Sequence, residues 1–114
     1  MALNNKTYDP VQVITKTAAE DLPAFRFVSH LGSLCASDTK AIGVTETNWL
    51  ANEKAALVTL GTIAVESSTV INMGDNITAD SSGKAKPAGN DSKINGRALE
   101  SAVSGGFTKI LLVP

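Results

Sequence analysis

The sequence predicts an all-β protein, with one compact barrel-like or sandwich-like domain of short antiparallel strands and an extended N-terminal arm. Valine, isoleucine and threonine supply 27 of the 114 residues, and β-branched side chains fit a pleated strand better than a helix. Nine glycines and four prolines divide the apolar positions into short runs of strand length. A chain of this size buries enough surface for one core. We therefore expect a flexible arm over residues 1–10 and a single β domain over residues 11–114.

The first ten residues show no alternation of apolar and polar side chains, so they offer no face to bury in a sheet. Pro10 disfavours helix at the residue before it, and Tyr8 is an amphipathic side chain of the kind that anchors interfaces. A frayed terminus is one interpretation. The functional interpretation is an arm that becomes ordered on a partner, and its expected contact residues are Thr7, Tyr8, Asp9 and Pro10.

Alternation of apolar and polar residues predicts the first strands. The segment Val11–Thr17 fits one strand, and Phe25–Leu31 fits another, with both phenylalanines and Leu31 on one face. A shorter strand is expected within residues 41–46. The next segment resembles a loop and contains the only tryptophan, Trp49, which fits either the core or an interface anchor.

The longest β pattern, Lys54–Glu66, changes phase at Gly61. Ala56, Val58 and Leu60 occupy even positions before the glycine, whereas Ile63 and Val65 occupy odd positions after it. Because side chains alternate with a period of two, an apolar face changes parity only where an extra residue is inserted. The sequence therefore predicts a bulge or tight bend at Gly61.

Turn signals separate the remaining strands. Gly74 ends one short apolar run, and Asp80-Ser81-Ser82-Gly83 is typical of a hairpin turn in which the glycine can adopt positive φ. Residues 97–103 also fit a helical period. The near-continuous apolar run at the C-terminus predicts a strand buried on both faces. The expected strands are Val70–Met73, Asn76–Ala79, Lys84–Pro87, Ile94–Glu100 and Phe107–Val113.

The composition argues against catalysis and against several kinds of partner. One histidine and one cysteine leave no disulfide, no cysteine-based or two-histidine metal site, and no base beside a nucleophile. We therefore expect no enzyme, no metal and no cofactor. The net charge of −1 gives no electrostatic reason for nucleic acid or an anionic membrane as partner. The unpaired Cys35, together with an N-terminus that lacks a signal-peptide pattern, predicts synthesis in a reducing cytoplasm.

Between Ala41 and Val113 the order of short motifs becomes specific. Along the chain they are Ala41-Ile42-Gly43-Val44, the turn at Asn52-Glu53, the run from Ala56 to Ile63, Met73-Gly74-Asp75-Asn76-Ile77, Ala79-Asp80 with Gly83-Lys84, Asn95-Gly96-Arg97-Ala98-Leu99-Glu100, and Gly105-Gly106-Phe107-Thr108-Lys109-Ile110. This order resembles that of the small capsid decoration, or cement, proteins of tailed bacteriophages. Asn52 stands where that family usually has glycine, and asparagine tolerates the same left-handed turn.

The resemblance implies a compact β-rich protein on the outer surface of the virion. It implies binding to the lattice of the major capsid protein, stabilisation of the expanded capsid, and a homo-oligomer, for which we expect a trimer rather than a dimer. It also favours strand over helix at residues 97–103. The alternative is a β-sandwich module that recognises a glycan or a host surface, which would need three or more exposed aromatic side chains.

Overall fold

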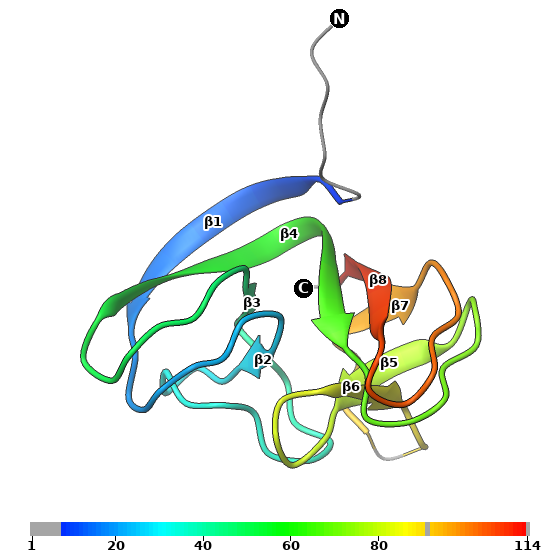
Figure 1. Cartoon of the computed structure of the whole chain (residues 1–114). Coiled ribbons are helices and arrows are strands. Elements are labelled where there is room, and N and C mark those ends of the chain that lie inside the picture. Colours follow the sequence, from blue (N-terminus) through cyan, green and yellow to red (C-terminus); the bar gives the residue numbers. More distant parts are fainter. Residues whose placement is uncertain (1–7, 91, 114) are drawn as a thin grey trace, which may run out of the picture.

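Eight antiparallel strands and no helix make up the described part of the protein, which is residues 8–90 and 92–113 of a computed structural model (Figure 1). The predicted all-β class is confirmed. The strands are β1 (Pro10–Thr17), β2 (Phe27–Val28), β3 (Gly43–Thr45), β4 (Lys54–Glu66), β5 (Asn76–Ala79), β6 (Ala85–Pro87), β7 (Gly96–Ala98) and β8 (Phe107–Leu112).

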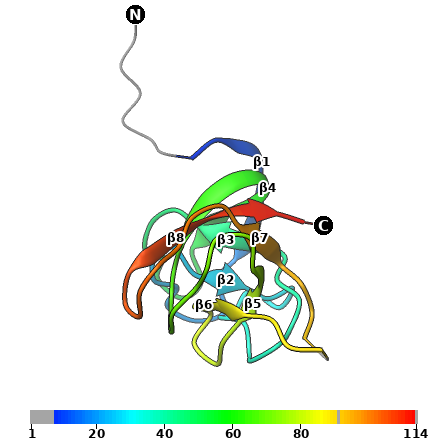
Figure 2. The same ribbon diagram turned by 90° about the vertical axis from the view of Figure 1, so that its right-hand side faces the viewer.

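Strand β4 connects two halves of the sheet. Its first half pairs with β1 and β3, and its second half pairs with β8. The strand order is β2-β3-β4-β8-β7-β5-β6, with β1 beside β4. The chain after β4 returns to β6, where the Ser68 amide donates to the Ala85 carbonyl at 2.9 Å. Strands β4, β8, β7, β5 and β6 therefore form a nearly closed barrel, whose last four strands face the viewer in Figure 2.

β4 bends sharply between its two halves (Figure 1), and Gly61 stands where its pairing partner changes. The pairing with β1 extends to Gly61, and the pairing with β8 begins at Thr62. Gly61 has φ +98°, a conformation that side chains with a Cβ rarely adopt. A Cβ at this position would collide with the Asp9 carbonyl and lie 2.8 Å from the Val11 amide nitrogen. The phase change in the sequence thus corresponds to a bend packed directly against β1.

Two apolar clusters cover opposite faces of β2–β4. The barrel core contains Phe27, Cys35, Val44, Val58, Ile63, Val65, Ile71, Ile77, Ala79, Ala85, Ala98, Ile110 and Leu112. The smaller cluster contains Ala18, Leu22, Val28, Ala55 and Leu57. Before Gly61, the sequence pattern assigned only the even positions of β4 to an apolar face. Ala55 and Leu57 are nevertheless fully buried, because the smaller cluster covers the opposite face as well.

Several predicted elements are shorter than expected. The segment Phe25–Leu31 contributes only Phe27–Val28 to the sheet, because Phe25 adopts φ +60° and Leu31 is exposed. The segment Val70–Met73 forms a single bridge through Ile71. The helical alternative for residues 97–103 is wrong, since β7 occupies Gly96–Ala98.

The last strand was expected to be buried on both faces, and this expectation is wrong. Thr108, Ile110 and Leu112 point into the barrel, whereas Phe107 is 52% exposed and Leu111 is 45% exposed. The outer face of a closed sheet needs a second layer to be covered, and the described residues place none over β8.

An arm was predicted over residues 1–10, and residues 1–7 of it lie outside the described part of the chain. Its last three residues contact the domain: β1 begins at Pro10, and Tyr8 packs against the barrel core. The Asp9 amide donates to Thr62 Oγ1 at 2.7 Å, and the Thr62 amide donates to the Asp9 carbonyl at 3.0 Å. The domain therefore extends at least two residues before β1.

We predict that Gly61→Ala destabilises the fold by about 3 kcal/mol, because it combines positive-φ strain with a backbone collision. Gly74→Ala is the matched control. Gly74 has φ +90°, but a Cβ there would have no atom within 4 Å, so we expect a loss of only about 1 kcal/mol. Denaturant melts measure both changes. Equal losses would mean that β1 does not pack tightly against the bend.

Candidate functional site

Three aromatic rings from distant parts of the chain form a continuous row, here called the aromatic row: Tyr8, Phe25 and Phe107. The centroids of Tyr8 and Phe25 are 6.2 Å apart at an interplanar angle of 80°. Those of Phe25 and Phe107 are 5.6 Å apart at 81°. Both pairs are edge-to-face contacts, the arrangement that the ring quadrupoles favour. The row runs from the partly buried Tyr8 to the exposed Phe107.

Phe25 is held in a strained backbone conformation at the centre of the row. Its φ of +60° is an outlier for a bulky residue, and such strain persists only where neighbouring structure enforces it. The Phe25 amide donates to the Thr45 carbonyl at 2.8 Å, and the Phe25 carbonyl accepts from the Glu66 amide at 3.0 Å. These bonds fix the backbone and place the ring between Tyr8 and Phe107.

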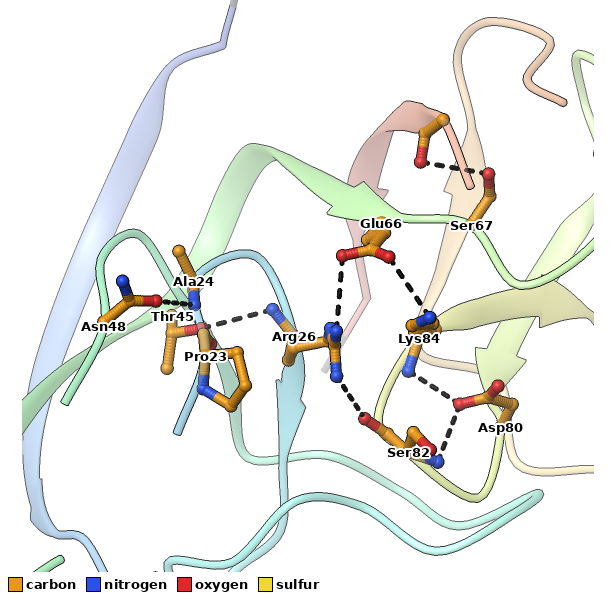
Figure 3. Close-up of polar contacts among 11 residues, drawn as sticks. Pro23, Ala24, Arg26, Thr45, Asn48, Glu66, Ser67, Asp80, Ser82 and Lys84 are labelled. Atoms are coloured by element: carbon orange, nitrogen blue, oxygen red, sulfur yellow. Dashed lines mark hydrogen bonds and ion pairs between the residues drawn. The ribbon is translucent and has the colours of Figure 1, made fainter. Parts of the chain in front are cut away.

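An ion-pair network centred on Glu66 connects β4 to Arg26 and to the β5–β6 hairpin (Figure 3). The Glu66 carboxylate lies 3.3 Å from Arg26 Nη2 and 3.2 Å from Lys84 Nζ. Arg26 Nη1 also donates to the Ser82 carbonyl at 3.1 Å. Glu66 is the register partner of Phe107 across β4 and β8. The network therefore ties the β5–β6 hairpin to the strands that carry the row.

Burial and neighbouring charges shift the pKa of Glu66 in opposite directions. Burial alone would raise the pKa of this carboxyl, but hydrogen bonds and charge interactions with Lys84 and Arg26 outweigh it and lower the pKa below its ordinary value of 4.5. In the row, burial and the neighbouring Glu46 raise the pKa of Tyr8. Burial also raises the pKa of the Cys35 thiol, which disfavours the reactive thiolate.

An exposed apolar surface continues from Phe107 onto two loops. We call Val70, Met73, Val103 and Phe107 the apolar patch; their side chains are between 52% and 69% exposed. The loops are joined by Ile71 and Ala102, which exchange two backbone hydrogen bonds of 2.9 Å. A depression of about 480 Å³ lies here, and its lining residues are all uncharged: Val70, Ile71, Asn72, Ser101, Ala102, Val103, Gly106 and Phe107. Apolar surface of this kind is typical of a contact with another macromolecule.

The residues singled out in the sequence fall in different places. Tyr8 belongs to the aromatic row, whereas Trp49 lies half-buried in the smaller cluster, where the Leu22 and Trp49 backbones pair. Gly74 ends the loop that carries Met73, and Gly83 closes the β5–β6 hairpin with φ +76°. The sequence pattern placed Phe107 in a strand buried on both faces, which is wrong because its side chain is exposed. No local signal marks the patch, because its residues lie on separate loops.

Neither a cluster of metal-ligating side chains nor a membrane-spanning helix is found among the described residues. Across residues 8–90 and 92–113, no group of three or more histidine, cysteine, aspartate or glutamate side chains could hold a metal ion. The same residues include no helix of the length and apolar character needed to cross a membrane. The geometry does offer an exposed apolar surface on a framework of antiparallel strands, which is typical of the class of proteins that bind another macromolecule.

Comparison with known families identifies the class more closely. The family model described as phage cement protein matches residues 6–112. The chain therefore belongs to the phage cement protein family, which confirms the resemblance inferred from the motifs. This is a family of structural proteins, and membership places the chain among phage head-associated proteins.

A solved structure shares the fold. The chain is similar to the N-terminal base of the head fiber protein gp8.5 of bacteriophage phi29, with a TM-score of 0.75 and 22% sequence identity. The similarity covers 90% of this chain and 93% of the phi29 chain. Among curated protein sequences, none matches this chain.

We predict that the Glu66 network stabilises the fold in a pH-dependent way. Because the folded pKa of Glu66 lies below its ordinary value of 4.5, the contribution is fully present above that value and is lost as the pH falls through the lower folded pKa. At pH 7, Glu66→Gln should cost about 1 kcal/mol, or roughly 4 °C in melting temperature. The difference from wild type should shrink near pH 3.

Glu100→Gln provides the control, since Glu100 is exposed and its side chain lies outside the network. This variant should have the same melting temperature as the wild type at both pH 7 and pH 3. A Glu66→Gln deficit of constant size from pH 7 to pH 3 would contradict the ionic account.

Proposed function

We propose that this protein decorates the phage head by binding the outer surface of the major capsid protein lattice and stabilising the expanded capsid. Family membership supports a role at the head. The observation that carries the finer proposal is the apolar patch, whose side chains are exposed on the surface of the protein.

The physical chemistry of a cement protein fits this surface. Aromatic and aliphatic side chains that lose water at the centre of an interface supply most of its binding energy. A ligand that binds only the expanded lattice shifts the equilibrium towards that lattice by mass action. Many copies on one shell add their contributions, so each contact can be modest. Synthesis in the host cytoplasm followed by attachment to the assembled shell is consistent with this role.

The arm is proposed to extend the same contact surface. Tyr8 touches Phe25, and Phe25 touches Phe107, so the aromatic row connects the arm to the apolar patch. Asp9 and Pro10 follow at the start of the edge strand β1. We propose that Thr7, Tyr8, Asp9 and Pro10 contact the capsid beside the patch, with Thr7 outside the described residues.

A glycan-binding module is the second candidate, because three aromatic rings lie next to one another. Such a site would need three exposed aromatic side chains, and Tyr8 and Phe25 are partly buried. The ring geometry favours the capsid proposal. Successive rings in the aromatic row are inclined by 80° and 81°, so they do not form the flat platform on which a sugar chain would stack.

We predict that Val103→Ser weakens binding to expanded capsids at least tenfold, which corresponds to about 1.4 kcal/mol. Val103 is 69% exposed, so the change should leave the melting temperature nearly unaltered. Phe107→Ser should weaken binding further. The measurement is co-sedimentation of purified protein with expanded capsids of the source phage.

Leu31→Ser is the matched control, because Leu31 is 82% exposed and belongs to neither the patch nor the aromatic row. It should bind capsids as the wild type does. Capsid binding by Val103→Ser at wild-type strength would reject the patch as the contact surface.

We also predict a homotrimer rather than a dimer, formed in solution or on the shell around a symmetry axis of the lattice. Sedimentation analysis gives the state in solution, and imaging of decorated capsids gives it on the shell. Monomers both in solution and on the capsid would refute this prediction. Pairs of molecules related by a two-fold axis would show that the oligomer is a dimer and not a trimer.

A further inference from the structure

A second concave surface lies at the seam between β1, β4 and the segment that leads into β3. This groove has a volume of about 590 Å³ and shares no lining residue with the depression at the apolar patch. Ile14, Ile42 and Leu60 supply its apolar lining, and Gln12, Lys40 and Thr59 are among its polar residues. The groove plays no part in the proposed capsid contact.

Lys40 brings a positive charge to the groove. Its ammonium group donates to the carbonyls of Ile94 and Val113, both at 2.7 Å, and Val113 also lines the groove. These acceptors are neutral, and Lys40 forms no ion pair with any carboxylate of the described residues. An ammonium has three N–H donors, so one remains beyond the two carbonyl bonds. Burial lowers the pKa of Lys40, as expected where no anion offsets the lost hydration.

The other polar residues also favour an acceptor as the ligand. Thr59 Oγ1 donates to Gln12 Oε1 at 2.8 Å, which orients the amide oxygen towards Thr59 and leaves the Gln12 NH₂ group to donate elsewhere. His30 lines the groove as well, and none of the described lining residues is acidic. Hydrogen-bond donors and positive charge thus lie next to aliphatic side chains.

We propose that this groove binds an extended acidic segment of a partner protein, in which carboxylate and apolar side chains alternate. Successive side chains of an extended chain point to opposite sides. A carboxylate can therefore meet Lys40 and Gln12 while its neighbours contact the aliphatic lining. Charge complementarity selects the acidic sequence, because a carboxylate would neutralise Lys40 in a partly desolvated site.

The test uses the isolated protein and a five-residue peptide, Val-Glu-Val-Glu-Val with blocked ends, followed by NMR titration. The acidic peptide should shift the amide signals of residues around the groove and bind at least tenfold more tightly than Val-Lys-Val-Lys-Val. Lys40→Gln should lower the affinity at least tenfold, whereas Lys93→Gln, which removes an exposed lysine outside the groove, should leave it unchanged.

Gln12→Glu is a second variant, which tests the proposal even if Lys40→Gln impairs folding. Glutamate can accept the same Thr59 hydrogen bond while adding a negative charge to the groove, so the acidic peptide should bind at least threefold more weakly. Asn72→Asp adds the same charge at the apolar patch and should have no effect.

Three outcomes would overturn the proposal. They are equal affinity for the acidic and basic peptides, signal shifts centred on the apolar patch, and inorganic phosphate shifting the groove signals as strongly as the peptide does. The last outcome would indicate a general anion site. The peptide titration contains no capsid, so a negative result would not affect the proposal that the apolar patch binds capsids. Conversely, wild-type capsid binding by Val103→Ser would not affect the proposal that the groove binds an acidic segment.

Discussion

The bend of β4 at Gly61 is the constraint on which the rest of the structure depends. One strand pairs with β1 and β3 before the glycine and with β8 after it. The backbone of β1 passes so close that no side chain fits at the bend. If β4 were straight, its first half could not be buried on both faces while its second half forms part of the barrel wall. The residue without a Cβ therefore determines both clusters of the core and the course of the chain around them.

Both candidate surfaces follow from this bend. Beyond it, Glu66 lies opposite Phe107 and bonds to the backbone of Phe25, which assembles the aromatic row beside the apolar patch. Just before it, Thr59 and Leu60 line the groove that contains Lys40. The surfaces differ in chemistry, since the patch is apolar and uncharged while the groove combines aliphatic side chains with donors. A rigid protein with two such surfaces is suited to hold other proteins in fixed positions.

The elements that could be predicted from the sequence are those encoded locally. The parity change around Gly61 and the Asp80–Gly83 turn each depend on a few neighbouring residues, and a bend and a hairpin stand at these positions. The conformation of Phe25 could not be predicted, because long-range bonds to Thr45 and Glu66 impose its positive φ. Phe107 looked internal within an apolar run, since only the closed barrel decides which face of β8 stays uncovered. The patch joins residues more than thirty positions apart, a distance that pattern analysis does not span.

The central claim is that the apolar patch is the surface by which the protein holds the phage head. Cryo-electron microscopy of expanded capsids saturated with the protein tests this most directly, because the fold can be placed in the density and its orientation determined. The account predicts that Val70, Val103 and Phe107 face the major capsid protein and lose their solvent exposure, with Tyr8 at the margin of the same contact. Decorated capsids in which these side chains point to solvent, while another face of the barrel touches the lattice, would contradict it.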